Sequence, residues 1–424
     1  MTEAVLQRGT RQPLMPVTAN LSKPEGYDIY PYYPIGDGKI RLGIETLVDW
    51  MAVQKAVCID GYVGVDWESI KARIETICAA KGISLRWVDA SAFMRSELEI
   101  DGLVAPYLGD SDSVWGRKTA LTLDAFLDTE AIGGLAPDPA FQLNIVAGIG
   151  ASYASDVFQL VYFDLPKNEL LFRMRGGSAF NLGSHRPIDR MNAYKRFFFV
   201  DWEVLNKRKQ EVLPRIAAFA DTQWPDTLTW MEGGDLYESL LALSGSVFRP
   251  RPWFDPGVWG GQWMKQRFAG LGDEENFAWS FELIAPENGI VLESSGILLE
   301  VTFDLLMFAA AEQVLGADGY RIFGDFFPIR FDFLDTFDGG NLSIQCHPTV
   351  DYIQRTFGER FTQDETYYIL DCKEDAKVYL GFHEDIDPAG FREVLQESIR
   401  EDKPIDVERF VQAFPSRKHA LFLI

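Results

Sequence analysis

The chain has 424 residues, of which 47% are hydrophobic and 13% aromatic, enough apolar material for well-packed globular domains. It carries 63 acidic and 40 basic side chains, and the resulting formal charge of −23 argues against nucleic acid or an anionic membrane as a partner. An anionic substrate must therefore be held by locally placed cations. No stretch of about 18 uncharged apolar residues occurs, and the N-terminus lacks a signal-peptide pattern, so we expect a soluble, cytoplasmic protein. The chain has four cysteines at unrelated spacings, which indicate reduced thiols: Cys58, Cys78, Cys346 and Cys372.

An N-terminal arm and two domains are predicted along the chain. Residues 1–26 are polar, punctuated by proline and without periodicity, so we expect an extended arm. Residues 27–245 alternate apolar runs with a helical pattern at Trp67–Ala80, where isoleucine recurs every three or four residues. Alternating strands and helices predict an α/β layer with a largely parallel sheet. The strand-like runs are Ala56–Ile59, Ile83–Val88, Leu143–Val146 and Val157–Phe163.

The segment Cys58–Trp67 reads as a strand end, a glycine-bearing turn and a helix start. This order resembles the phosphate-loop region of a uridine-kinase-type scaffold. A functional phosphate loop has G-x-x-x-x-G-K-[ST], in which lysine meets the phosphates and the hydroxyl binds magnesium. Here Gly64 is followed by Val65 and Asp66, and an aspartate suits the N-cap of a helix better than a phosphate site. We therefore predict a kinase-like domain without a functional phosphate loop, and a nucleoside or sugar kinase is the least favoured function.

Two further segments of the first domain are interpreted as structural. The aromatic run Phe197–Trp202 is predicted to be a buried strand end. The basic run Asn206–Lys209 is predicted to be the solvated face of a helix. Neither segment is assigned a function.

Residues 246–424 have a different sequence pattern, with short apolar runs separated by Gly, Asp and Pro turns. Such a pattern is typical of a β-sandwich or barrel. Two helical pieces interrupt it, at Leu305–Val314 and Pro388–Arg400. The predicted strands are Gly289–Leu292, Ile297–Phe303, Ile329–Leu334 and Val378–Phe382.

The most informative segment is Asn341–Pro348, which reads N-L-S-I-Q-C-H-P. In a β-strand, Ser343, Gln345 and His347 would share one face, while the apolar side chains between them would face a core. Glu365 follows eighteen positions after His347, directly before the strand-like run 366–370. An imidazole, an amide oxygen and a carboxylate from adjacent strands predict a site for a divalent metal.

The context of this segment resembles the type I mannose-6-phosphate isomerases, zinc enzymes of the cupin superfamily. The resemblance covers roughly the last 175 residues and includes L-S-I-Q-x-H-P with the spaced glutamate, Trp259-Gly260-Gly261, and Trp279–Glu282. It implies a cupin-like β-barrel or jelly roll, apparently truncated. It implies further that Gln345, His347 and Glu365 are zinc ligands and that Ser343 lies near the substrate phosphate. A fourth ligand and a catalytic arginine are expected beyond Ile424.

The chain departs from the isomerase pattern at the substrate phosphate. Asp332 and Gln363 stand where lysines are usual in the family, and Arg330, two positions from Asp332, is a candidate replacement for substrate binding. The leading hypothesis is a zinc-dependent enzyme that interconverts mannose 6-phosphate and fructose 6-phosphate, or a related sugar phosphate, through an enediolate. The alternative is a non-catalytic sugar-binding or regulatory protein. Other divalent metals also suit such nitrogen and oxygen ligands.

Overall fold

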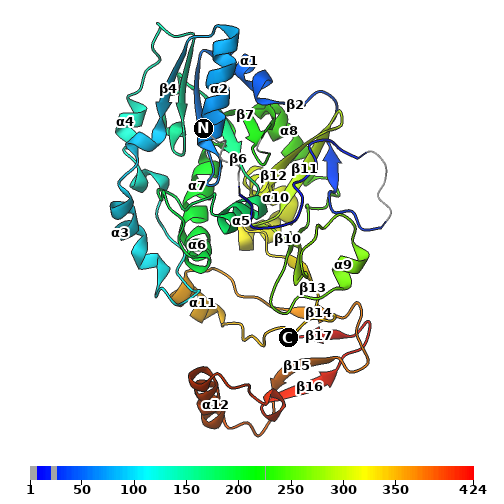
Figure 1. The fold of residues 1–424 in the computed structure, drawn as a ribbon. Helices are drawn as coiled ribbons and strands as arrows, with labels where there is room; N and C mark the ends of the chain where they lie inside the picture. Colours follow the sequence, from blue (N-terminus) through cyan, green and yellow to red (C-terminus); the bar gives the residue numbers. More distant parts are fainter. Residues whose placement is uncertain (1–6, 21–25, 225) are drawn as a thin grey trace. The chain divides into compact units, whose positions relative to one another are not determined.

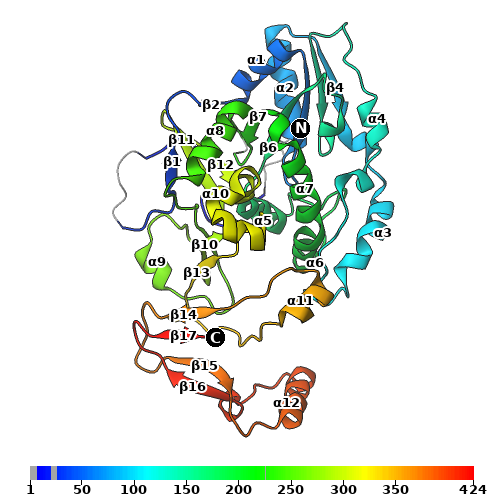
Figure 2. The same ribbon diagram turned by 180° about the vertical axis from the view of Figure 1, so that it is seen from behind.

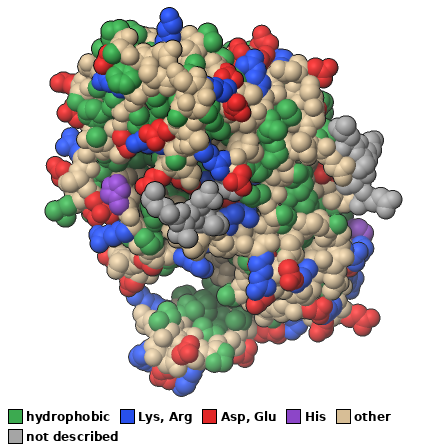
Figure 3. Space-filling view, turned by 45° about the horizontal axis from the view of Figure 1, so that its top comes forward, with side chains coloured by type: hydrophobic (Ala, Val, Ile, Leu, Met, Phe, Trp, Pro, Cys, Tyr) green, Lys and Arg blue, Asp and Glu red, His purple; other side chains and the backbone are tan. Residues whose placement is uncertain are grey.

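The structure, a computed structural model, describes residues 7–20, 26–224 and 226–424. It divides into two compact units, Met1–Gly340 and Asn341–Ile424 (Figures 1 and 2). In these described ranges no helix is both long and apolar enough to cross a membrane. Acidic and basic side chains are interspersed on the face drawn in Figure 3, and no broad basic surface is visible there.

The largest sheet in the described part of the first unit has seven strands in the order β2-β8-β7-β6-β3-β5-β4. The run from β7 to β4 is parallel, whereas β8 pairs antiparallel with both β7 and β2. Every residue of β3 and β5 is buried, as expected for parallel strands covered by helices on both faces. The predicted α/β layer with a largely parallel sheet is therefore confirmed. The strands are β2 Ile40–Leu42, β3 Ala56–Gly61, β4 Leu85–Asp89, β5 Leu143–Ala147, β6 Gln159–Asp164, β7 Ile216–Asp221 and β8 Thr229–Glu232.

Helices and short helical turns connect and cover these strands (Figure 1). The α-helices of the first unit are α1 Ile44–Gln54, α2 Trp67–Lys81, α3 Glu97–Leu108, α4 Thr129–Gly133, α5 Lys167–Gly176, α6 Arg190–Arg196, α7 Trp202–Val212, α8 Gly233–Ser244, α9 Trp263–Arg267 and α10 Phe303–Phe323. The short turns are η1 Ala90–Phe93, η2 Leu123–Phe126, η3 Ala151–Tyr153, η4 Phe197–Asp201 and η5 Leu213–Arg215.

The turn between β3 and α2 packs closely against side chains of Leu165 and Leu170. Asp66 caps α2 by accepting a hydrogen bond from the Ser69 backbone N–H at 3.1 Å, as its sequence position predicts. Gly64 has a φ of +85°, and a Cβ built there would lie 2.6 Å from a methyl carbon of Leu170. A side chain at position 64 would therefore clash with Leu170 of α5. The likeness to a kinase scaffold stays a prediction.

Two smaller sheets complete the first unit, with the strand orders β1-β11-β12 and β13-β10-β9. Their core is continuous with that of the large sheet, because one cluster of buried residues contains Leu47 as well as Leu299 and Leu306. The predicted boundary near residue 245 therefore lies inside a compact unit, and α10 packs against α8 across it. The strands are β1 Tyr32–Pro34, β9 Trp253–Asp255, β10 Trp279–Ile284, β11 Gly289–Ser294, β12 Ile297–Thr302 and β13 Arg330–Leu334.

The interpretation of two segments in the first unit was wrong. The run Phe197–Trp202 is largely buried, as predicted, but it is helical: Phe197–Asp201 form the π-helical turn η4 between α6 and α7, and Trp202 begins α7. Lys209 is completely buried, and its Nζ lies 2.8 Å from Asp164 Oδ2, so it does not belong to a solvated face. A buried carboxylate at the end of β6 requires a partner, and the basic run on α7 supplies it.

The second unit contains two-stranded sheets and two α-helices. β14 (Thr366–Tyr368) pairs antiparallel with β17 (Leu421–Leu423), and β15 (Lys377–Phe382) pairs antiparallel with β16 (Val411–Pro415). The helix predicted at Pro388–Arg400 is confirmed as α12. A barrel requires a sheet whose first and last strands pair, and none of the small sheets in the described residues closes in this way. The cupin-like barrel therefore stays a prediction. The helical elements are α11 Val350–Phe357, α12 Pro388–Glu401 and η6 Val407–Arg409.

A candidate metal site

The segment 341–349 has no regular secondary structure, so its assignment as a β-strand was wrong. Ile344 is 53% exposed and Cys346 is exposed, so this alternate face does not pack into a core. Alternation of polar and apolar residues is compatible with a strand, but a strand exists only where its backbone groups pair with a neighbour. Among the described residues this segment joins no strand ladder.

His347 and Glu365 come together in the second unit, with Nε2 of the imidazole 3.2 Å from Oε2 of the carboxylate. Glu365 directly precedes β14, and its carbonyl accepts a hydrogen bond from the Ile424 N–H at 3.1 Å. The pairing of β14 with β17 therefore holds the backbone of Glu365 in place. Both side chains are partly shielded, with 23% and 28% of their surface exposed.

Local hydrogen bonds hold the histidine's side of the pair. Thr349 caps α11 by accepting from the Tyr352 N–H at 3.3 Å. Thr362 donates through its hydroxyl to the Pro348 carbonyl at 2.5 Å, which ties the end of the 341–349 segment to the chain just before Glu365. The hydrogen bond between Thr362 and Pro348 thus brings together the segments that carry His347 and Glu365, which are eighteen residues apart in the sequence.

Ser343 and Gln345 lie together, as the sequence pattern predicts. The amide Nε2 of Gln345 donates to the hydroxyl of Ser343 at 3.1 Å. Gln345 is exposed and stands two residues before His347. Ser343 and Gln345 are therefore neighbours, as are His347 and Glu365, although the backbone that carries them is not a strand. The predicted convergence of Gln345, His347 and Glu365 on one metal stays a prediction.

The His347–Glu365 pair has a spacing that suits one divalent cation. Zn–N bonds of about 2.0–2.1 Å and Zn–O bonds of about 2.0–2.2 Å at a tetrahedral angle separate the two donor atoms by about 3.4 Å. The observed 3.2 Å is close to that value. In the part of the chain that the structure describes, no group of three or more His, Cys, Asp or Glu residues is placed to hold a metal. The hydrogen bond of Gln345 goes to Ser343, and the roles of Gln345, His347 and Glu365 as metal ligands stay predictions.

Arg330 and Asp332 lie on β13 of the first unit, where β13 pairs with β10. Burial raises the pKa of Glu287, and the positive charge of Arg330 opposes that shift. Arg330 thus acts on a carboxylate of its own unit. Its predicted contact with substrate stays a prediction.

Glu282, in the predicted tryptophan–glutamate segment, belongs to a buried polar cluster on β10. It accepts hydrogen bonds from the hydroxyls of Tyr27 and Ser280, and Arg249 Nη2 lies 3.2 Å from its Oε2. Burial and the hydrogen bond to Glu282 raise the pKa of Tyr27. These contacts join the start of the first domain to β10.

A buried cluster of charged groups in the first unit contains Arg251, Glu300 and Asp221. Arg251 Nε donates to both oxygens of Glu300 at 2.9 Å, and Arg251 Nη2 donates to Asn168 Oδ1 at 3.0 Å. Burial, followed by the charge of Glu300, raises the pKa of Asp221 to about 8. These residues are far apart in the sequence, and no spacing pattern links them.

Comparison with known proteins gives a match to a protein family and a distant similarity to a curated enzyme. Residues 43–245 match a protein family described as "Domain of unknown function (DUF8485)". A curated protein, the "Probable mannose-6-phosphate isomerase GmuF" of Bacillus subtilis (strain 168), is 27% identical over 132 residues. That alignment covers 31% of this chain and 40% of the relative, so the chain spans less than half the length of the protein that it resembles.

A solved structure, "Crystal Structure Analysis of the Mannose 6-Phosphate Isomerase from Bacillus subtilis", aligns over 42% of this chain and 51% of that chain. The sequence identity is 20% and the TM-score is 0.30. The sequence similarity thus indicates a region distantly similar to a mannose-6-phosphate isomerase.

Proposed function

We propose that the chain belongs to a metal-dependent sugar-phosphate isomerase, with mannose 6-phosphate and fructose 6-phosphate as the leading substrate pair. The observation that carries the proposal is the His347–Glu365 contact of 3.2 Å. It is supported by the distant sequence similarity to a probable mannose-6-phosphate isomerase. The identity of the sugar phosphate is itself a proposal. Asp332 and Gln363 stand at positions where the family resemblance implies lysines that contact the substrate.

In this proposal the neutral imidazole of His347 and the carboxylate of Glu365 bind one divalent cation, and the amide oxygen of Gln345 joins them. Zinc is the leading candidate, since imidazole and carboxylate donors suit it. When bound, the cation supplies a Lewis acid that stabilises negative charge on the oxygen atoms of the sugar. The reaction moves a hydrogen from C2 to C1, while the C1 carbonyl becomes a hydroxyl and the C2 hydroxyl becomes a carbonyl.

The Ser343 hydroxyl, held by Gln345 at 3.1 Å, is proposed to contact the substrate phosphate. A hydroxyl donates one hydrogen bond to an anionic oxygen without adding charge. Arg330, on β13 of the first unit, is proposed as a substrate-binding residue from the family resemblance alone.

Metal titration of the full chain tests this proposal directly. After treatment with chelator and its removal, Zn²⁺ is expected to bind with one ion per chain in a calorimeter. His347→Gln and Glu365→Gln are each expected to weaken this binding at least about a hundredfold, because each removes a direct ligand.

Matched controls are available in the same unit. His383 Nε2 donates to the Glu408 carbonyl at 3.0 Å, and Glu384 is exposed, so His383→Gln and Glu384→Gln change the same residue types outside the site. Equal weakening in the controls and in the site variants would contradict the proposed site. Metal and sugar binding without isomerisation would instead favour the non-catalytic alternative.

A further inference from the structure

The chain between the histidine and the glutamate of the proposed metal site forms a loop built around α11 (Figure 1). The helix starts at the Thr349 cap and ends at Gly358, which has a φ of +70° and donates to the Gln354 carbonyl at 3.2 Å. On the returning side, the Gln354 side-chain amide donates to the Arg360 carbonyl at 3.0 Å. The residues between the two proposed ligands therefore follow a defined path, which is set by contacts within the loop.

The two proposed ligands are held in different ways. Glu365 directly precedes β14, and the next residue, Thr366, donates through its hydroxyl to the Phe422 carbonyl of β17 at 2.8 Å. His347 lies in the segment 341–349, which joins no strand ladder among the described residues. The histidine therefore needs an anchor other than a strand pair to stay beside the glutamate.

Thr362 supplies such an anchor. Its hydroxyl donates to the Pro348 carbonyl at 2.5 Å, across the base of the loop. Pro348 directly follows His347, and its ring fixes the φ torsion that lies between the histidine and the bonded carbonyl. Thr362 itself stands three residues before Glu365. One hydrogen bond thus spans the short distance between the backbone segments that carry the two side chains.

We propose that Thr362 is a positioning residue, which holds His347 beside Glu365 before a metal ion binds, and this role presupposes the proposed function of the pair as ligands. Thr362 acts through the Pro348 carbonyl and does not bind the ion. Without its hydroxyl, the histidine's segment samples positions away from the glutamate. A ligand pair that is assembled in only a fraction of the molecules binds its ion more weakly by that fraction.

The first measurement needs no metal. In the chelator-treated full-length protein, labelled at histidine and glutamate, a nuclear Overhauser effect between the His347 ring and the Glu365 side chain reports their proximity. This signal is expected in the wild type, where Nε2 and Oε2 are 3.2 Å apart, and its loss in His347→Gln assigns it. Thr362→Val removes the hydroxyl, keeps the branched shape and is expected to weaken the signal. Thr362→Ser keeps the hydroxyl and is expected to retain it.

The second measurement is calorimetric titration of the same proteins with Zn²⁺. Thr362→Val is expected to weaken zinc binding about tenfold, the usual effect of removing a group that orients a metal ligand. Thr362→Ser is expected to bind zinc as the wild type does. Circular dichroism checks the fold of each variant. If Thr362→Val does not fold, Gln354→Leu, which releases the second tie of the loop, is expected to weaken the same signal and decides the question.

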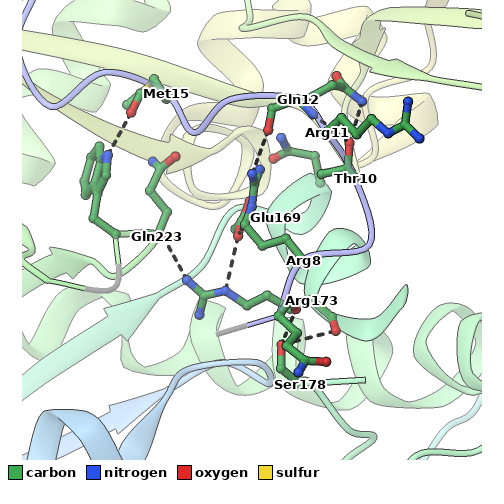
Figure 4. A network of polar contacts seen from close by, with 12 residues as sticks. Arg8, Thr10, Arg11, Gln12, Met15, Glu169, Arg173, Ser178 and Gln223 are labelled. Carbon is green, nitrogen blue, oxygen red and sulfur yellow. Dashed lines mark hydrogen bonds and ion pairs between the residues drawn. The ribbon is translucent and has the colours of Figure 1, made fainter. Parts of the chain in front are cut away.

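Two controls are matched in type. Ser178, in the first unit, donates through its hydroxyl to the Gln7 carbonyl at 2.6 Å (Figure 4). Ser178→Ala therefore removes a hydrogen bond of the same kind between two separate segments of the chain. Thr356→Val changes an exposed threonine on α11, within the loop itself. Both controls are expected to keep the signal between His347 and Glu365 and the zinc affinity of the wild type.

The positioning role of Thr362 is overturned if the wild type lacks the metal-free signal, if Thr362→Val keeps it in full, or if the controls lose it equally. Unchanged zinc affinity in Thr362→Val would overturn it as well. A wild type that shows the signal but binds no zinc would contradict the proposed function instead, and the metal-free comparison of Thr362→Val with Thr362→Ser would still decide the positioning role.

Discussion

At the scale of single residues, the contact between His347 and Glu365 was predictable from the sequence, whereas the buried charges of the first unit were not. The pair rests on a short pattern, Gln-x-His followed by a spaced glutamate, in which local chain geometry brings the residues close. Lys209 was predicted to be solvated because it belongs to a run of basic residues, and such runs usually face the solvent. Its partner Asp164 is 45 residues away, and only the packing of α7 on β6 brings the two together.

Asp221 provides a prediction for pH dependence. Burial raises its pKa to about 8 in the folded chain, against about 3.9 in an unfolded chain. Between these values the folded state keeps a proton that the unfolded state has lost, so this residue's contribution to stability falls as the pH rises from about 4 to about 8. The slope from this residue is at most about 1.4 kcal/mol per pH unit.

The measurement is the free energy of unfolding in urea at pH 5.5 and 7.5 for the wild type and for Asp221→Asn. The stability advantage of the wild type is expected to shrink at the higher pH, since the amide does not ionise. Asp156→Asn, at an exposed carboxylate whose side chain is 92% accessible, controls for the loss of one acidic group. An advantage that stays constant across this range would contradict the raised pKa.

At the scale of elements, hydrophobic periodicity predicted most of the parallel sheet. The runs leading to β3, β5 and β6 are mostly apolar, with Asn144 and Gln159 as polar exceptions, because both faces of these strands are covered. Helix α2 buries Ile70, Ile74 and Cys78. The errors have physical causes. The aromatic run at 197–201 has no period that separates a strand from a π-helical turn, and alternation at 341–348 does not create a partner strand.

The N-terminal arm gives a prediction at this scale. Met15 is 2% exposed and packs with Trp224, Val291 and Leu298 in a small separate cluster. Met15→Ala is expected to destabilise the chain by about 2 kcal/mol, since truncating a buried methionine removes apolar contacts and leaves a cavity.

Urea unfolding monitored by tryptophan fluorescence measures this loss. Thr18→Ala changes an exposed side chain on the same arm and is expected to stay within about 0.5 kcal/mol of the wild type. If Met15→Ala is as stable as Thr18→Ala, the arm does not pack as described.

At the scale of the whole molecule, the compact units meet at residue 340, whereas the sequence pattern predicts a domain boundary near residue 245. The change from helix-rich to strand-rich sequence near residue 245 is real, and the matched family also ends at residue 245. However, β11, β12 and α10 share their hydrophobic core with the large sheet, so the compact unit continues to Gly340. Local composition reports the type of element, whereas the extent of a unit depends on long-range contacts.

The two units are expected to differ in local stability. Every residue of β3 and β5 is buried, whereas the buried side chains described in residues 341–424 are Phe410, Val411 and Ser416. Two-stranded sheets are marginally stable by themselves. Hydrogen exchange measured by mass spectrometry should therefore be at least about tenfold faster in β14–β17 than in β3, β5 and β6. Equal protection in both units would contradict this account.

The most direct test of the central claim is to follow mannose 6-phosphate by NMR in the presence of the full-length protein and Zn²⁺. The account predicts that fructose 6-phosphate accumulates, that chelator stops the conversion, and that His347→Gln lacks it while His383→Gln retains it. A chain that binds zinc but produces no fructose 6-phosphate, or one whose conversion survives both chelator and His347→Gln, would contradict the assignment.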